Sequence, residues 1–203
     1  MRNYFCTICI IICFCCCNNN PVKTAINKDE PYHFDVPAGW TSEHIPFPIS
    51  FAGSIPYKGL EDVRFTGGWG NPSSDEYWSY EFVWWLDGDQ PMNADTLQQN
   101  MRIYYTGLVS DNITRRNIPA AKVVPVMAAY KKINPAPGDV ETYTGTVNML
   151  DYMIQQPMVL NSLVHVKKCA GHTVILYEMS PKPYSHAVWQ NLNKVDLSFT
   201  CAH

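Results

Sequence analysis

The chain has 203 residues, of which 15 are lysine or arginine and 18 are aspartate or glutamate, so its formal net charge is −3. No segment is strongly basic, which argues against a nucleic-acid partner. Without residues 1–17 the remainder carries 14 basic and 18 acidic residues, a net charge of −4. About 180 residues are enough for one domain with its own hydrophobic core.

The first 17 residues have the pattern of an export signal. Arg2 precedes an apolar run from Tyr4 to Cys17, and three asparagines follow. Such a run has the length of a signal-peptide core. At roughly 1.5 Å per residue it is too short to cross a hydrocarbon layer of about 30 Å. We therefore expect an exported protein, with residues 1–17 as its signal peptide.

Six of the eight cysteines lie in this segment, without the paired spacing that a zinc site needs. The end of the segment resembles a bacterial lipoprotein signal, in which one cysteine is lipidated and becomes the mature N-terminus. The resemblance implies Cys17 as the acceptor, with Cys16 next, and a membrane anchor through the lipid. Polar residues 18–28 are expected to form a tether, and residues 29–203 a single domain.

The first predicted elements after the tether are a strand over 32–36 and a turn at Pro37–Trp40. Pro46, Pro48, Pro56 and Gly59 predict an irregular loop next, with a short strand near 63–65.

The segment from Gly67 to Gly88 holds four tryptophans and two tyrosines. Residues 77–86 alternate as a strand. One face is apolar and is expected to be core: Trp78, Tyr80, Phe82, Trp84 and Leu86. The other face is mixed: Tyr77, Ser79, Glu81, Val83 and Trp85. If a second layer covers this face, Trp69, Tyr77 and Trp85 are also core; if not, they form an exposed aromatic patch that marks a binding surface.

The remaining pattern predicts a helix, four strands and a second helix. Asn93 can cap the first helix, whose apolar stripe runs from Leu97 to Leu108, with Gly107 near its end. The strands are expected over 122–133, 141–152, 158–168 and 173–179, joined by short turns as an antiparallel meander. Pro125 indicates an edge position or a bulge for the first of them. Ser185 can cap the last helix. The fold class predicted is α+β: an antiparallel sheet with a central helix and a C-terminal helix packed on it.

Cys169 and Cys201 are the two cysteines outside the signal segment, and each ends a predicted element. An even, small number in an exported chain favours a structural disulfide, with two buried free thiols as the alternative. Closing that loop would stabilise the fold by about 3–4 kcal/mol in the chain-entropy model.

Four stretches resemble a family of small uncharacterised exported bacterial proteins: PAGWTSEHIPFPISFAGSIPYKGLEDVRFTGGWG, YWSYEFVWWLDG, YYTGLV and SPKPYSHAVWQNLNKVDLSFTC. The likeness covers nearly the whole mature chain and implies no particular activity. More distantly, the stretch from Phe34 to Trp40, the element order and the C-terminal helix resemble the PsbP-like fold. A fold likeness would not by itself assign a function.

The chain has no nucleotide, serine-hydrolase or metal-protease motif, so no cofactor and no metal are expected. His165, between two valines, is expected to be a packed or surface histidine. Carboxylates crowd the aromatic segment, and paired carboxylates beside aromatic residues are typical of glycoside hydrolases. Glu81 is the strongest candidate, because it lies mid-strand and would need a partner if buried; Arg64 could supply one.

The sequence therefore favours an exported, non-catalytic binding module of the cell envelope, membrane-anchored if lipidated and otherwise periplasmic or secreted. Its partner would be an envelope protein or a glycan. The candidate binding residues are Arg64, Trp69, Tyr77, Glu81 and Trp85. The alternatives are a carboxylate-based hydrolase acting on envelope or extracellular glycans, and a scaffolding role in which a partner protein covers the patch.

Overall fold

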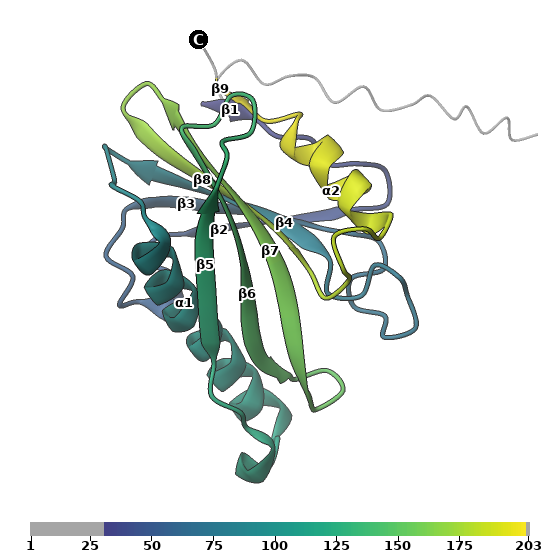
Figure 1. The fold of residues 1–203 in the computed structure, drawn as a ribbon. Helices are drawn as coiled ribbons and strands as arrows, with labels where there is room; N and C mark the ends of the chain where they lie inside the picture. Colours follow the sequence, from purple (N-terminus) through teal and green to yellow (C-terminus); the bar gives the residue numbers. More distant parts are fainter. Residues whose placement is uncertain (1–30, 202–203) are drawn as a thin grey trace, which may run out of the picture. The chain divides into compact units, whose positions relative to one another are not determined.

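A computed structural model describes residues 31–201 (Figure 1). These residues belong to one compact unit. The expected signal peptide, its lipidation site at Cys17 and the polar tether lie outside the described residues and remain predictions. None of the helices within the described range combines the length and the apolar character that crossing a membrane requires.

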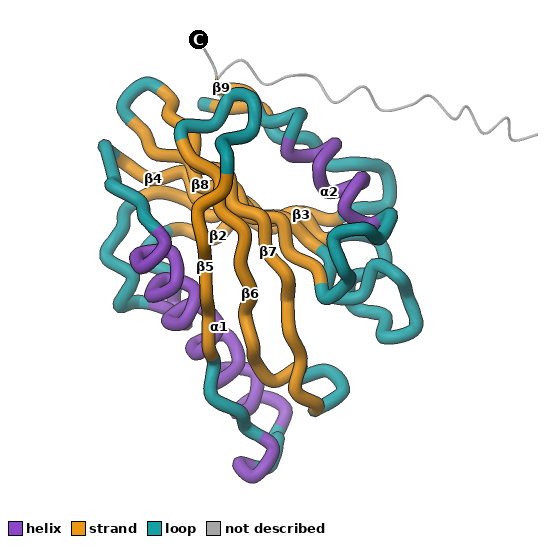
Figure 2. The backbone as a smooth tube through the Cα atoms, in the orientation of Figure 1, coloured by secondary structure: helices purple, strands orange, loops and turns teal. Residues whose placement is uncertain are grey.

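A seven-stranded antiparallel sheet forms the centre of this unit, in the order β2-β3-β4-β8-β7-β6-β5 (Figures 1 and 2). Its strands are β2 (Thr41–Pro46), β3 (Gly59–Phe65), β4 (Tyr80–Asp87), β5 (Met127–Ile133), β6 (Glu141–Asp151), β7 (Gln156–Cys169) and β8 (His172–Ser180). The last four form the expected meander, and β5 lies at the edge of the sheet, one of the two alternatives that Pro125 indicated. A small second sheet pairs β1 (Tyr32–His33) with β9 (Thr200–Cys201).

The two helices cover opposite faces of the large sheet (Figure 1). Helix α1 (Ala94–Arg116) contacts β5, β6 and the short helix η1 (Ser50–Ala52), whereas α2 (Val188–Asp196) contacts β8 and β4. A second short helix, η2 (Ala120–Lys122), precedes β5. The α+β class with a large antiparallel sheet is thus confirmed. We call the two sides of the sheet the α1 face and the α2 face.

The alternation along β4 separates two hydrophobic cores. Phe82 points to the α1 face and stacks on Tyr104 and Tyr177, with ring centroids 5.6 and 4.5 Å away. On the α2 face, Val83 and Trp85 belong to a second core with residues of β8 and the chain after α2. A second layer therefore covers the mixed face of this strand, which decides the alternative that the sequence left open.

The predicted strand over 77–86 begins later than expected, at Tyr80. Trp78 has a positive φ of 53°, and its backbone N–H donates to the Trp69 carbonyl at 3.0 Å. This turn interrupts the alternation, so Tyr77 and Trp78 both join the α1-face core. Strand β2 was missed, because its flanking prolines suggest a loop; it lies at the edge of the sheet, where proline is tolerated.

Each helix differs from expectation at one end: α1 at its C-terminus and α2 at its N-terminus. Helix α1 is capped by Asn93 as predicted, with the Thr96 amide donating to Asn93 Oδ1 at 2.9 Å. It continues past Gly107 to Arg116, and Asn117 ends it in a left-handed conformation. Helix α2 starts at Val188 without a side-chain cap, so the predicted Ser185 cap is wrong.

The Cys169–Cys201 disulfide is present, with a Cα–Cα distance of 5.7 Å. It joins the end of β7 to β9 and so ties down the segment that follows α2.

Candidate functional site

The five residues predicted to form a binding face do not form one exposed surface. Tyr77 and Trp69 lie with the α1-face core, where the Tyr77 hydroxyl donates to Asp151 at 2.7 Å. Trp85 is 7% exposed on the other face, packed against Tyr32 and His172. Glu81 has no exposed surface. The proposed aromatic patch is therefore wrong, because the α2 layer covers one half of it and the turn at Trp78 redirects the other half.

Arg64 does not serve Glu81 as a hydrogen-bond partner. The two residues are register partners on β3 and β4. The Arg64 guanidinium instead donates to Asp62, with Nη2 and Oδ2 2.9 Å apart, and to the carbonyl oxygens of Phe34 and Asp35. Asp62 also lies 2.9 Å from His44 Nε2. The guanidinium is thus occupied, which leaves Glu81 without the partner that the sequence suggested.

A cluster of ionisable side chains lies on the α2 face around Glu81. We call it the acidic cluster; its members are Glu81 on β4, Asp139 before β6, His165 and Lys167 on β7, Glu178 on β8, and Asp196 at the end of α2. Glu81 and Glu178 are register partners on neighbouring strands, on the same side of the sheet. The cluster therefore joins five segments that are far apart in sequence.

Asp139 organises the basic members of the acidic cluster. Its Oδ2 lies 2.7 Å from His165 Nδ1, and its Oδ1 accepts from Lys167 Nζ at 2.7 Å. The other imidazole nitrogen, Nε2, is 3.4 Å from a Glu178 oxygen. Lys167 Nζ is also 3.4 Å from Asp196 Oδ1. Asp139 is thus fully engaged, whereas Glu178 and Asp196 have only long contacts.

Several buried polar atoms of the acidic cluster lack a hydrogen bond to any described residue. They are both carboxylate oxygens of Glu81, both of Glu178, Oδ1 of Asp196 and Nε2 of His165. Such atoms are rare in folded proteins, because an unpaired buried polar group destabilises the fold by about 1–3 kcal/mol. Their convergence at one place points to an occupant that supplies protons or positive charge.

Burial and mutual repulsion shift the protonation of this cluster. Burial, reinforced by the charges of Glu178 and Asp196, raises the pKa of Glu81 well above its usual range. Burial also raises the pKa of Glu178. Burial alone would lower the pKa of His165, but its contacts with Asp139 and Glu178 raise the pKa to about 9. Burial thus favours the neutral form of both glutamates, whereas the neighbouring carboxyl groups favour the charged form of His165.

Three members of the acidic cluster have the donor atoms of a metal site. The ligand atoms offered by His165, Glu178 and Asp196 all lie within 4.8 Å of one another. An imidazole and two carboxylates are ligand types found around zinc and other divalent transition metals. The alternative chemistry of the same atoms is proton sharing between neighbouring carboxyl groups.

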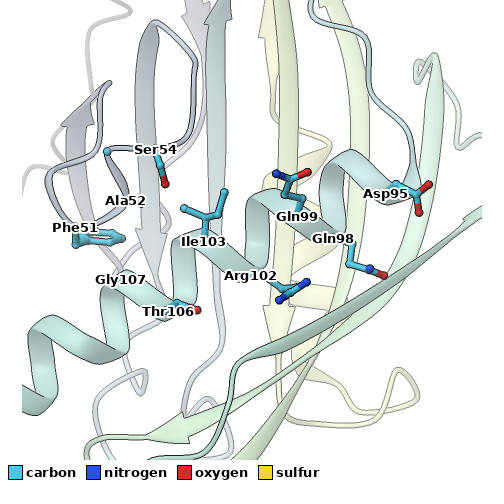
Figure 3. Close-up of a pocket in the computed structure, with 11 residues that line it drawn as sticks. Phe51, Ala52, Ser54, Asp95, Gln98, Gln99, Arg102, Ile103, Thr106 and Gly107 are labelled. Carbon is cyan, nitrogen blue, oxygen red and sulfur yellow. The ribbon is translucent and has the colours of Figure 1, made fainter.

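A groove of about 690 Å³ on the outer side of α1 is the second candidate site (Figure 3). We call it the α1 groove; it is lined by Phe51–Ser54 from η1 and the loop after it, and by Asp95, Gln98, Gln99, Arg102, Ile103, Thr106 and Gly107 from α1. Gln99 and Ile103 extend toward the η1 side of the helix, and Gln98 and Arg102 extend to the other side. The groove thus combines an aromatic ring with amides, a guanidinium and a carboxylate.

Gly107 allows η1 to pack directly on α1 beside this groove. A Cβ atom at position 107 would lie 1.7 Å from the Phe51 carbonyl oxygen, a separation that no side chain can adopt. This close approach explains why a glycine stands in the middle of a 23-residue helix.

Most members of both sites were not predicted from the sequence. His165 was interpreted as a packed or surface histidine, and no local spacing connects Asp139, Glu178 and Asp196. One clue was available: ionisable residues at 165, 167 and 178 interrupt runs rich in valine, leucine and isoleucine. The α1 groove lies outside the apolar stripe of α1, so helical periodicity places its residues only on a solvent-facing side.

No protein-family model and no curated protein matches this chain.

Proposed function

We propose that the protein is an exported, non-catalytic binding module of the cell envelope that engages a glycan through the α1 groove. The observation that carries the proposal is the groove itself, a concave surface with mixed polar and apolar lining. Lipidation at Cys17 would hold the module at a membrane; an unlipidated chain would act in the periplasm or outside the cell.

The lining chemistry suits a polar, largely uncharged polymer. Gln98, Gln99 and Arg102 supply amide and guanidinium donors, and the Gln side chains also accept hydrogen bonds. Phe51 offers a half-buried ring on which the apolar face of a sugar can pack. Few, well-placed polar groups around an apolar contact are typical of ligand sites.

Titration with chitotetraose and with soluble fragments of the cell-wall glycan, followed through backbone amide NMR shifts, tests this proposal. We expect shifts confined to η1 and residues 95–107. Arg102→Ala should weaken binding about tenfold or more, the effect of losing a hydrogen bond from a charged donor. Arg115→Ala is the matched control, because Arg115 is an exposed arginine of the same helix outside the groove.

Two results would contradict the proposal: no shifts with either glycan, or binding that Arg102→Ala and Arg115→Ala change equally. A shift pattern on another surface would also reject the α1 groove as the site.

The alternative, a carboxylate hydrolase, is favoured by the adjacent carboxyl groups of Glu81 and Glu178. Their burial opposes it: these residues are 0% and 1% exposed, so a glycan chain cannot reach them unless α2 moves. Glycan cleavage by the parent chain that Glu81→Gln abolishes, with binding intact, would establish the hydrolase instead.

Export and anchoring are tested by mass spectrometry of the intact protein purified from membranes. We expect a lipid-modified chain that starts at Cys17 or Cys16. An unmodified soluble chain would reject the anchor and move the search for partners to the periplasm or the medium.

A further inference from the structure

Three buried ligand atoms of the acidic cluster converge from three different elements. They belong to His165 on β7, Glu178 on β8 and Asp196 on α2, and one ligand atom of each lies within 4.8 Å of the others. His165, Glu178 and Asp196 are at most 5% exposed. His165 Nε2, both Glu178 oxygens and Asp196 Oδ1 have no hydrogen-bond partner among the described residues.

Their spacing is close to that around a four-coordinate metal ion. Ligand bonds of about 2.0–2.2 Å place neighbouring ligand atoms roughly 3.4 Å apart in tetrahedral geometry. His165 Nε2 and Glu178 Oε1 are already 3.4 Å apart. The ligand atom of Asp196 lies within 4.8 Å of the other two, so the Asp196 side chain would move closer to them to complete this geometry.

Asp139 orients the imidazole ring of His165 for metal binding. Because Nδ1 lies 2.7 Å from Asp139 Oδ2, the hydrogen on Nδ1 is directed to that carboxylate and Nε2 faces Glu178. A carboxylate behind a histidine fixes the ring orientation and strengthens the histidine as a ligand. Thr142 adds a hydrogen bond to the same Asp139 oxygen at 2.6 Å, which holds the carboxylate in place.

Charge balance also favours a bound cation. The cluster holds four carboxyl groups, on Glu81, Asp139, Glu178 and Asp196, but only one lysine, Lys167, and one imidazole, His165. Arg64 is engaged by Asp62 and does not bond to any of them. Buried charges are tolerated when paired or when they coordinate a metal. A divalent ion would supply positive charge beside these carboxyl groups.

We propose that His165, Glu178 and Asp196 bind a divalent transition-metal ion of the zinc class. Glu81, next to Glu178 on the sheet, is placed to supply a fourth ligand or to accept a hydrogen bond from a metal-bound water. The imidazole ligand favours zinc-class ions over magnesium and calcium, which prefer oxygen ligands alone. A small ion can reach the site because Lys167, at its edge, is partly exposed.

Isothermal titration of the EDTA-stripped full chain with ZnCl₂ tests this inference. We expect one zinc ion per chain with micromolar or tighter affinity, and at least tenfold weaker binding of MgCl₂ and CaCl₂. His165→Gln and Glu178→Gln should each weaken zinc binding at least 100-fold. His172→Gln is the matched control, because His172 also faces a carboxylate, Asp87, at 3.6 Å but outside the acidic cluster.

A spectroscopic readout on the unsubstituted chain keeps the inference testable if a variant fails to fold. Bound Co²⁺ should give the visible absorption of a low-symmetry, four- or five-coordinate site, and zinc X-ray absorption should show one imidazole among oxygen ligands. The proposal is overturned by absent zinc binding, by equal loss in His172→Gln, or by calcium binding as tight as zinc.

The proposals for the metal site and for the α1 groove can be tested independently. They lie on opposite faces of the sheet, so Arg102→Ala should leave zinc affinity unchanged and His165→Gln should leave glycan shifts unchanged.

Discussion

Two fully buried glutamates, one on each face of the sheet, differ in the hydrogen bonds that their carboxyl groups accept. Glu61 on the α1 face accepts from Trp84 Nε1 and from the Tyr104 hydroxyl, each at 2.8 Å. Glu81 on the α2 face has no hydrogen-bond partner among the described residues. Both residues have 0% exposure, so burial alone does not distinguish them.

The difference lies in their neighbours across the strands. Glu61 is paired with Trp84, a neutral donor. Glu81 lies between Arg64, whose guanidinium is bonded to Asp62, and another carboxylate, Glu178. Burial raises the pKa of Glu61 to about 7, although hydrogen bonds from Tyr104 and Trp84 lower it. The α1 face thus gives its buried acid two hydrogen-bond donors, whereas the α2 face leaves both carboxylate oxygens of Glu81 without one, as a ligand site does.

The largest expected effect is a contrast between Glu61→Ala and Glu81→Ala. Glu61→Ala leaves two buried donors unpaired and opens a cavity, so it should lower the free energy of unfolding by about 3–5 kcal/mol. Glu81→Ala opens a cavity but also removes repulsion with Glu178, so its loss should stay below about 2 kcal/mol. Urea denaturation of the EDTA-treated chains at pH 7 measures both. Equal losses would show that the two faces do not differ in this way.

The disulfide comes next, because it supports only the α2 face. Cys169 and Cys201 are separated by 32 residues, so replacing both by serine should lower the free energy of unfolding by about 3–4 kcal/mol in the chain-entropy model. Hydrogen exchange should become faster in α2 and β9 but not in α1. Loss of protection in α1 of similar size would contradict a local role for the disulfide.

The pH dependence of the free energy of unfolding tests the raised pKa of Glu61. Its pKa rises from the ordinary value of 4.5 to about 7 in the folded chain. Between these values the folded state holds a proton that the unfolded state releases. Stability from this group is therefore complete below pH 4.5 and is lost as pH rises toward 7.

The loss is on the order of 3 kcal/mol at most. Other buried carboxyl groups titrate as well, so the measured quantity is the difference between the stability curves of the parent chain and Glu61→Gln. A difference curve that is flat between pH 4.5 and 7 would contradict the raised pKa.

The smallest effect concerns the sign of coupling between neighbouring residues. A double-mutant cycle with Glu81→Gln and Glu178→Gln, in EDTA, should show repulsion of about 1 kcal/mol. The corresponding cycle with Glu61→Gln and Trp84→Phe should show attraction of similar size. Attraction between Glu81 and Glu178 would mean that the two carboxyl groups share a proton tightly enough to act as a stabilising pair.

Regular elements were predicted well wherever one periodicity continued without interruption. The four-strand meander, the Asn93 cap and the apolar face of β4 all follow from residue spacing, because side chains alternate in strands and recur every three to four residues in helices. The predicted strand start failed at Trp78, whose left-handed backbone is not encoded by alternation. The end of α1 was misplaced at Gly107, a glycine that is required by close packing rather than by a turn.

The sequence by itself determined the α+β class, the antiparallel order of the last four strands and the aromatic core, since these depend on local periodicity and short connections. Only the tertiary structure decided where the charges lie. Five segments spread over more than 100 residues of chain contribute to the acidic cluster. Spacing along the sequence cannot predict that these segments lie close together in the fold. The apolar face of α2 packs against the sheet, and this packing buries Glu81 and Trp85. Because Asp196 is the last residue of α2, the same packing places it close to His165.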